Sequence, residues 1–209
     1  MPLLSEWNRK LHFYTGLYFL LFLWLFSVTG LLLNHSTWRF HQYWPQRKQT
    51  TSQHPIQPPA ERDDLEKAQD LMQQLGISGE VEWPATPAAP GRFDFRVAKP
   101  GRMMEIKTDL AAGRATVERM EVNGWGVLTM LHTFSGVRVN DPKAQRDWLA
   151  TKIWSFSMDA LAVGLLFMVC SSYYMWYRLQ AKRRWGWIAL GLGMLSCGFF
   201  AAGLRWLDW

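Results

Sequence analysis

The chain has 209 residues, a formal net charge of +6 and a hydrophobic fraction of 49%. Its mean hydropathy is only −0.13, because the apolar residues gather in three windows that contain almost no charge. This segregation excludes a single soluble domain and predicts a membrane protein with three transmembrane α-helices and a small α+β module between the first two. Membrane topology also explains the basic pI of about 9.5, so we expect no nucleic-acid partner.

The first apolar window contains no Asp, Glu, Lys or Arg between Leu11 and Trp38. A hydrocarbon core about 30 Å thick needs roughly 20 apolar residues in a helix, and the run Tyr14–Leu33 supplies them. The run is longer than the apolar region of a signal peptide, and no small-x-small cleavage site follows it. Residues 1–35 are therefore predicted to form a cytoplasmic leader and an uncleaved first transmembrane helix.

The polar middle of the chain divides into a linker and a module. Residues 36–59 form an aromatic and basic collar and then a segment whose prolines predict an irregular linker. Residues 60–122 are predicted to be the α+β module, because one amphipathic helical pattern is followed by short alternating runs. The expected elements are a helix over 60–76, capped by Gly76, and strands over 79–83, 92–98, 102–109 and 115–122.

The remainder of the chain returns to the membrane. Residues 123–147 begin with an apolar run that is too short to span, which predicts an interfacial or re-entrant segment. Residues 148–178 hold the second transmembrane helix, 179–184 a cytoplasmic loop rich in cations, and 185–209 the third helix with a periplasmic tail. The positive-inside rule places that loop and the leader in the cytoplasm and the module in the periplasm. The third helix has a stripe of small residues every four positions, which predicts close approach of another helix, in the same chain or another subunit. The stripe consists of Ala189, Gly193, Cys197 and Ala201.

Two short stretches share one pattern: Leu-His, two residues that include an aromatic one, Thr or Ser, and Gly. The first contains His12 and Gly16, and the second contains His132 and Gly136. A histidine with a glycine four residues later suits haem, because imidazole binds iron axially and glycine leaves room for the macrocycle. A chance match between segments rich in leucine and aromatic residues is the alternative.

The remaining helix-end histidine, His35, lies roughly 34 Å from His12 at 1.5 Å per residue, so one haem cannot use both. Under the expected topology His35 and His132 share the outer membrane face, and they are the predicted axial ligands of a haem b iron. His12 could serve a second haem only with a residue such as Met175 or with a symmetry mate. The alternative for His35 is an interfacial residue that bonds lipid headgroups.

The sequence also suggests environments for the other histidines, for Asp159 and for the two cysteines. His41 and His54 fall in the collar and linker and are expected to be solvated. Asp159 lies about two turns inside the second span, where a charge is costly. It is expected to take up a proton, to pair with an arginine such as Arg138 or Arg39, or to lie in the headgroup layer if the span begins later. The two cysteines are expected to be small packing residues.

Several motifs occur in a distinctive order along the chain. They are Arg9-Lys-Leu-His12-x3-Gly16, then Thr29-Gly30-Leu-Leu-Leu-Asn34-His35, then Glu105-Ile-Lys-Thr-Asp109-Leu-Ala-Ala-Gly113-Arg-Ala, then Leu131-His132 and the run from Trp154 to Trp176. This order resembles the PepSY-associated transmembrane family, and the third motif is similar to the PepSY signature of strand, Asp, turn, Gly and strand. The resemblance implies a PepSY-like fold for the module.

The resemblance also implies a function. Larger relatives include inner-membrane ferric-siderophore reductases that carry b-type haem on histidines. It thus implies an inner-membrane haem b electron-transfer protein, an oxidoreductase that would reduce a ferric siderophore or another redox partner during iron uptake. The competing hypothesis is a non-catalytic anchor in the lipid bilayer, whose module binds a partner protein or assembles with other membrane subunits or as a homo-oligomer.

Overall fold

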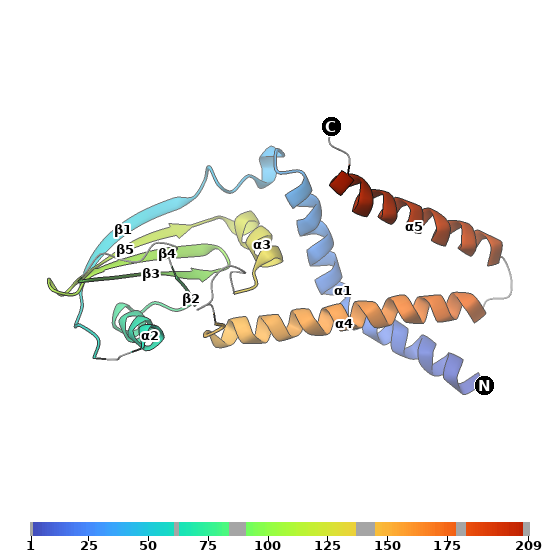
Figure 1. The fold of residues 1–209 in the computed structure, drawn as a ribbon, viewed down its shortest axis with the longest axis horizontal. Coiled ribbons are helices and arrows are strands. Elements are labelled where there is room, and N and C mark those ends of the chain that lie inside the picture. The colour runs from blue at the N-terminus through green and yellow to red at the C-terminus, as the bar shows by residue number, and fades with distance from the viewer. Residues whose placement is uncertain (1, 61–62, 84–90, 137–144, 179–182, 207–209) are drawn as a thin grey trace. The chain divides into compact units, whose positions relative to one another are not determined.

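The computed structural model describes residues 2–60, 63–83, 91–136, 145–178 and 183–206 (Figure 1). The chain divides into two compact units, Met1–Leu20 with Ala160–Trp209, and Leu21–Asp159. The helices are α1 (Pro2–Asn34), α2 (Asp64–Leu75), α3 (Gly124–Thr133), α4 (Leu149–Arg178) and α5 (Arg183–Trp206), with a 3-10 turn η1 at Arg39–His41. The strands are β1 (Lys48–Pro55), β2 (Glu80–Glu82), β3 (Arg92–Lys99), β4 (Arg102–Asp109) and β5 (Arg114–Glu121).

The module is one five-stranded sheet in the order β1-β5-β4-β3-β2, and every neighbouring pair is antiparallel. Helix α2 packs on one face of the sheet (Figure 1). The buried core between them is apolar and comprises Ile56, Ala68, Leu71, Met72, Val81, Phe95, Val97, Met104, Ile106, Ala115 and Val117. Because side chains alternate between the faces of a strand, the residues between these core positions project from the other face.

The predicted module elements are confirmed with small shifts at their ends. Helix α2 begins after Asp63, whose side chain accepts the Leu65 N–H, and ends at Gly76 in the left-handed conformation (φ 64°). All four expected strands are present, as β2, β3, β4 and β5. Gly101 (φ 86°) forms the tight turn between β3 and β4, a conformation that favours glycine. Residues 84–90, between the expected strands over 79–83 and 92–98, lie outside the described residues.

Strand β1 departs from the prediction, because Lys48–Pro55 lie in the segment expected to be an irregular linker. The strand pairs with β5 over all eight residues, from Lys48 opposite Glu121 to Pro55 opposite Arg114. All eight of its residues are exposed, so it has no buried apolar face to produce an alternating pattern. Backbone pairing with β5 holds this edge strand. Its proline is the last residue, where the missing N–H disturbs the ladder of hydrogen bonds least.

Within the described residues, three helices are long and apolar enough to cross a membrane: Leu3–Asn34, Leu149–Arg178 and Arg183–Gly203. The expected leader is helical, since α1 already begins at Pro2. In the first unit, α1 and the C-terminal part of α4 run antiparallel. Asn8 donates to the Ser171 carbonyl, Gly16 adjoins Met168, and Gly164 adjoins the Phe19 ring.

Helix α3 lies in the segment 123–147, which was expected to be interfacial or re-entrant. It packs against the module. Asn123 caps its first turn by accepting the Gly126 N–H, and the Asn123 amide donates to Gln46 Oε1 at 2.8 Å. Val127 packs on the β3–β4 turn, where any side chain at Gly101 would collide with it. The collar, the sheet and α3 therefore form one packed body within the second unit.

Candidate functional site

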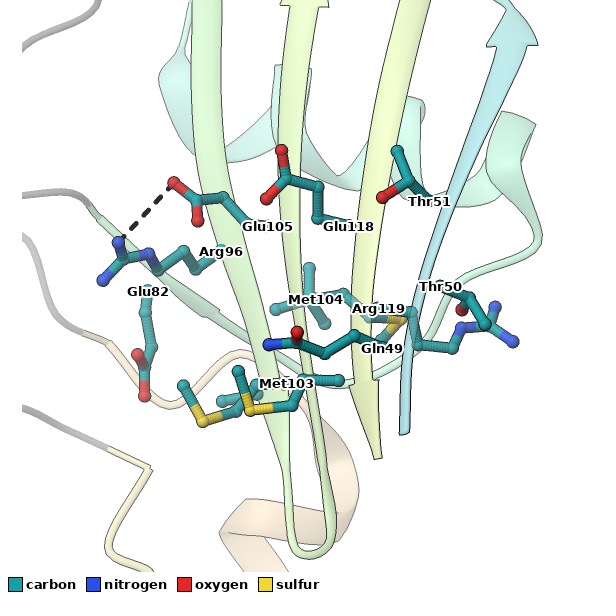
Figure 2. Close-up of a pocket in the computed structure, with 13 residues that line it drawn as sticks. Gln49, Thr50, Thr51, Glu82, Arg96, Met103, Met104, Glu105, Glu118 and Arg119 are labelled. Atoms are coloured by element: carbon teal, nitrogen blue, oxygen red, sulfur yellow. Dashed lines mark ion pairs between the residues drawn. The ribbon is translucent and has the colours of Figure 1, made fainter. Parts of the chain in front are cut away.

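The sheet face opposite α2 carries a groove of about 310 Å³ (Figure 2). Two rows of cross-strand neighbours line it, since residues opposite each other in an antiparallel pair project from the same face. The first row is Ala98, Met103, Met120 and Gln49, and the second is Glu82, Arg96, Glu105, Glu118 and Thr51. The groove thus combines two flexible thioethers with a line of charged groups.

The charges of the second row are partly compensated. Glu105 and Glu118 stand directly opposite each other on β4 and β5, an unfavourable placement for like charges. Arg96 lies 3.5 Å from Glu105, and Lys107 lies 2.7 Å from Glu118. The hydrogen bond to Glu118 raises the pKa of Lys107 above its ordinary value. Each of the two carboxylates thus has a cation beside it on the open face of the sheet.

A second polar contact joins the module to the start of α4. Glu80, in β2, is 0% exposed, and its carboxylate accepts the backbone N–H groups of Asp147 at 2.5 Å and Trp148 at 3.2 Å. N–H groups at the start of a helix have no partner inside the helix, and a carboxylate there also interacts favourably with the helix dipole. Burial and the neighbouring Glu80 charge raise the pKa of the Asp147 carboxyl, while Lys152 opposes the shift.

His132, on α3, contacts one face of α1 within the second unit. Its Nδ1 lies 2.7 Å from the Thr29 hydroxyl, and its ring lies 4.9 Å from the Phe26 ring. The Thr29 hydroxyl has one hydrogen and lies 2.7 Å from both the Leu25 carbonyl and His132 Nδ1, so it accepts from His132 Nδ1–H when it donates to the carbonyl. The lone pair of the neutral imidazole is then on Nε2, as a metal-binding histidine requires.

His35 does not join His132. It is half-buried and stacks on Trp38, with the ring centroids 4.4 Å apart and the planes 3° from parallel. At 3.6 residues per turn, His35 lies roughly 120° or more around α1 from each residue that contacts His132. The structure therefore places the two predicted axial ligands on different sides of the helix.

The predicted haem-clearing glycines meet protein side chains. A Cβ at Gly16 would lie 3.2 Å from Met168 Cε, and one at Gly136 (φ 69°) would collide with Thr151. His12 is half-buried on the α1 face that packs against α4, and its Nδ1 has no hydrogen-bond partner among the described residues. These contacts account for both glycines through packing of the protein itself.

Of the other polar residues considered in the sequence, one lies as expected and one does not. His54 is exposed, as expected, and bonds Ser52. His41, expected to be solvated, is 4% exposed, because it lies against the Phe40 and Trp38 rings of the collar. Asp159 is exposed on α4, and the structure shows it no ion pair within the described residues, a range that excludes its proposed partner Arg138.

The described residues do not fit the predicted bis-histidine haem site. Its two ligands lie on different sides of α1, and the spaces beside both glycines are occupied by side chains. His132 can present Nε2 as an axial donor when its Nδ1–H donates to Thr29.

The three long apolar helices and the sheet-and-helix module define a multi-pass membrane protein that carries a small α+β module. The sequence model of the family described as putative PepSY_TM-like matches residues 3–200, so the chain belongs to that family. Comparisons with curated proteins and with solved structures gave no match.

Proposed function

We propose that the chain is a membrane-anchored recognition protein whose module binds a polypeptide partner in the periplasm. The groove on the open face of the sheet is the observation that carries the proposal. α2 covers one face completely enough to leave Phe95, Val97 and Ile106 at 1% exposure or less. The opposite face keeps its Met and Glu rows accessible. The hydrophobic core therefore lies on one face of the sheet, and the other face is open to a partner.

The composition of the groove defines the partner. Methionine side chains adapt to irregular apolar groups and are common at binding surfaces. The groove as a whole carries three carboxylates, Glu82, Glu105 and Glu118, against two guanidinium groups, Arg96 and Arg119, so the charge of its lining is negative. A segment with apolar side chains on one row and basic side chains on the next complements this surface.

Site-specific photo-cross-linking in cells tests the proposal. A photo-reactive amino acid at Met103 should yield a discrete adduct with a second polypeptide, and Glu118→Lys in the same chain should weaken that adduct. The matched control carries the photo-reactive amino acid at Gln73, which is exposed on α2. The proposal fails if Met103 yields no adduct, or if Gln73 yields the same one.

A second candidate function is electron transfer through haem b, with reduction of a ferric chelate as the activity that the resemblance implied. The observation that favours it is the contact of His132 Nδ1 with the Thr29 hydroxyl at 2.7 Å, since an Nδ1–H donated to that hydroxyl leaves the lone pair on Nε2. Haem would supply one-electron chemistry there. Protein produced with ample haem should then show a Soret band that His132→Ala abolishes and His54→Ala leaves unchanged. A featureless spectrum excludes this candidate.

A further inference from the structure

The first unit contains a basic groove that recognition by the module does not use. It measures about 380 Å³ and is lined by Ser5, Glu6 and Arg9 of α1 and by Tyr174, Met175 and Arg178 of α4. We propose that this groove binds the phosphate of an anionic phospholipid at the membrane surface.

The antiparallel packing of α1 on α4 creates the groove. Contacts of Asn8 with Ser171 and of Gly16 with Met168 bring the first turns of α1 beside the last turns of α4. Arg9 and Arg178, 169 positions apart in the sequence, consequently line one hollow. Two arginines from opposite ends of the sequence thus lie at the same end of these helices.

The two arginines in the groove are free to bind an anion. Neither Arg9 nor Arg178 forms an ion pair within the described residues, and Arg178 lies over the Tyr174 ring at 6.0 Å. The one carboxylate, Glu6, is already held by Lys10 at 2.8 Å. Two guanidinium groups suit a phosphate diester, because each offers a planar fork of donors to its oxygens.

The surroundings point to a lipid phosphate rather than a dissolved one. The groove lies at the end of two apolar spans, and exposed aromatic side chains flank it, with Trp7 60% and Tyr177 53% accessible. Amphipathic rings of this kind gather at the headgroup level of a bilayer. Arg183 and Arg184 begin α5 close by in the sequence and add to the attraction for an anionic leaflet.

Native mass spectrometry of the full-length protein, extracted from bilayers with equal amounts of phosphatidylglycerol and phosphatidylcholine, tests the site. The wild type should retain phosphatidylglycerol in preference. Each basic residue near the surface contributes about 1 kcal/mol, so the pair Arg9→Gln with Arg178→Gln should lower that preference about thirtyfold. The control pair Arg183→Gln with Arg184→Gln removes the same charge at the start of α5, outside the groove, and should lower it much less.

Each outcome decides the proposal. Equal loss in the two pairs would show a diffuse surface charge and overturn it. So would removal of bound lipid from the wild type by millimolar inorganic phosphate, which would indicate a site for the free anion. If the double variant does not fold, Arg178→Gln alone serves, because Arg178 is the exposed last residue of α4. An unchanged lipid preference in that variant would also overturn the proposal.

Discussion

The contact between Glu80 and the start of α4 should control how firmly the module is attached to that helix. Glu80→Ala removes a fully buried carboxylate and leaves the N–H groups of Asp147 and Trp148 without their acceptor. A hydrogen bond to a charged group contributes about 1.5 kcal/mol at the low end of its range. Two such bonds give a loss of about 3 kcal/mol, which corresponds to roughly a hundredfold easier local opening.

Amide hydrogen exchange of the full-length protein in detergent measures this opening directly. Glu80→Ala should accelerate exchange at Trp148 about a hundredfold while β4 stays protected, because the core between α2 and the sheet is intact. Glu80→Gln keeps the volume and one acceptor but not the charge, so its effect should be intermediate. Glu82→Ala makes the same change two residues along β2 and is the control.

Two results would refute the reasoning. If exchange at Trp148 is the same in Glu80→Ala and the wild type, the carboxylate does not hold α4. If exchange rises equally across β4, Glu80 stabilises the whole module and has no particular role at the start of α4.

Three further predictions concern other contacts. Asp147→Asn should stabilise the start of α4 at neutral pH by up to about 1 kcal/mol. The folded pKa of Asp147 is raised, so its contribution to stability falls as the pH rises from the ordinary value through the raised one; hydrogen exchange across this range should show a slope in the wild type that the variant lacks. Thr29→Val keeps the shape but removes the acceptor for His132, and it should lower the thermal midpoint through a loss of about 1 kcal/mol; an unchanged midpoint would mean that the contact carries no stability. Gly193 has no side chain within 4 Å of its Cβ position among the described residues, so Gly193→Leu should disturb association of the third span with another helix, whereas Leu192→Ile should not; equal behaviour in gel filtration would assign this face to lipid.

The sequence was sufficient for the elements whose side chains alternate between environments. The run from Arg102 to Asp109 was predicted to its last residue, because Met104, Ile106 and Thr108 are buried in turn between polar neighbours. Helix α2 was predicted for the same reason, with its apolar face at helical spacing and Gly76 at its end. When one side of a helix or strand is buried, apolar residues recur at the period of that element, and this period identifies it in the sequence.

Where the fold rests on backbone pairing or on contacts between distant residues, the sequence carried no such signal. Strand β1 is polar throughout and exposed throughout, so only its pairing with β5 reveals it. Glu80 resembles any acidic residue at the start of a strand, and its burial depends on Asp147 and Trp148, about 67 positions later. The open-face groove likewise arises from the register of four strand pairs.

The two histidine-glycine stretches show why a shared spacing is a weak guide to a shared site. Gly16 lies inside a regular helix, where its missing side chain admits Met168. Gly136 follows the end of α3 with φ 69°, a conformation that most residues avoid, and it adjoins Thr151. A common haem-binding geometry would place both glycines in equivalent backbone conformations beside their histidines. Because they differ, the chemistry of each histidine follows from its own neighbours, and the Thr29 hydroxyl beside Nδ1 makes His132 the one to test.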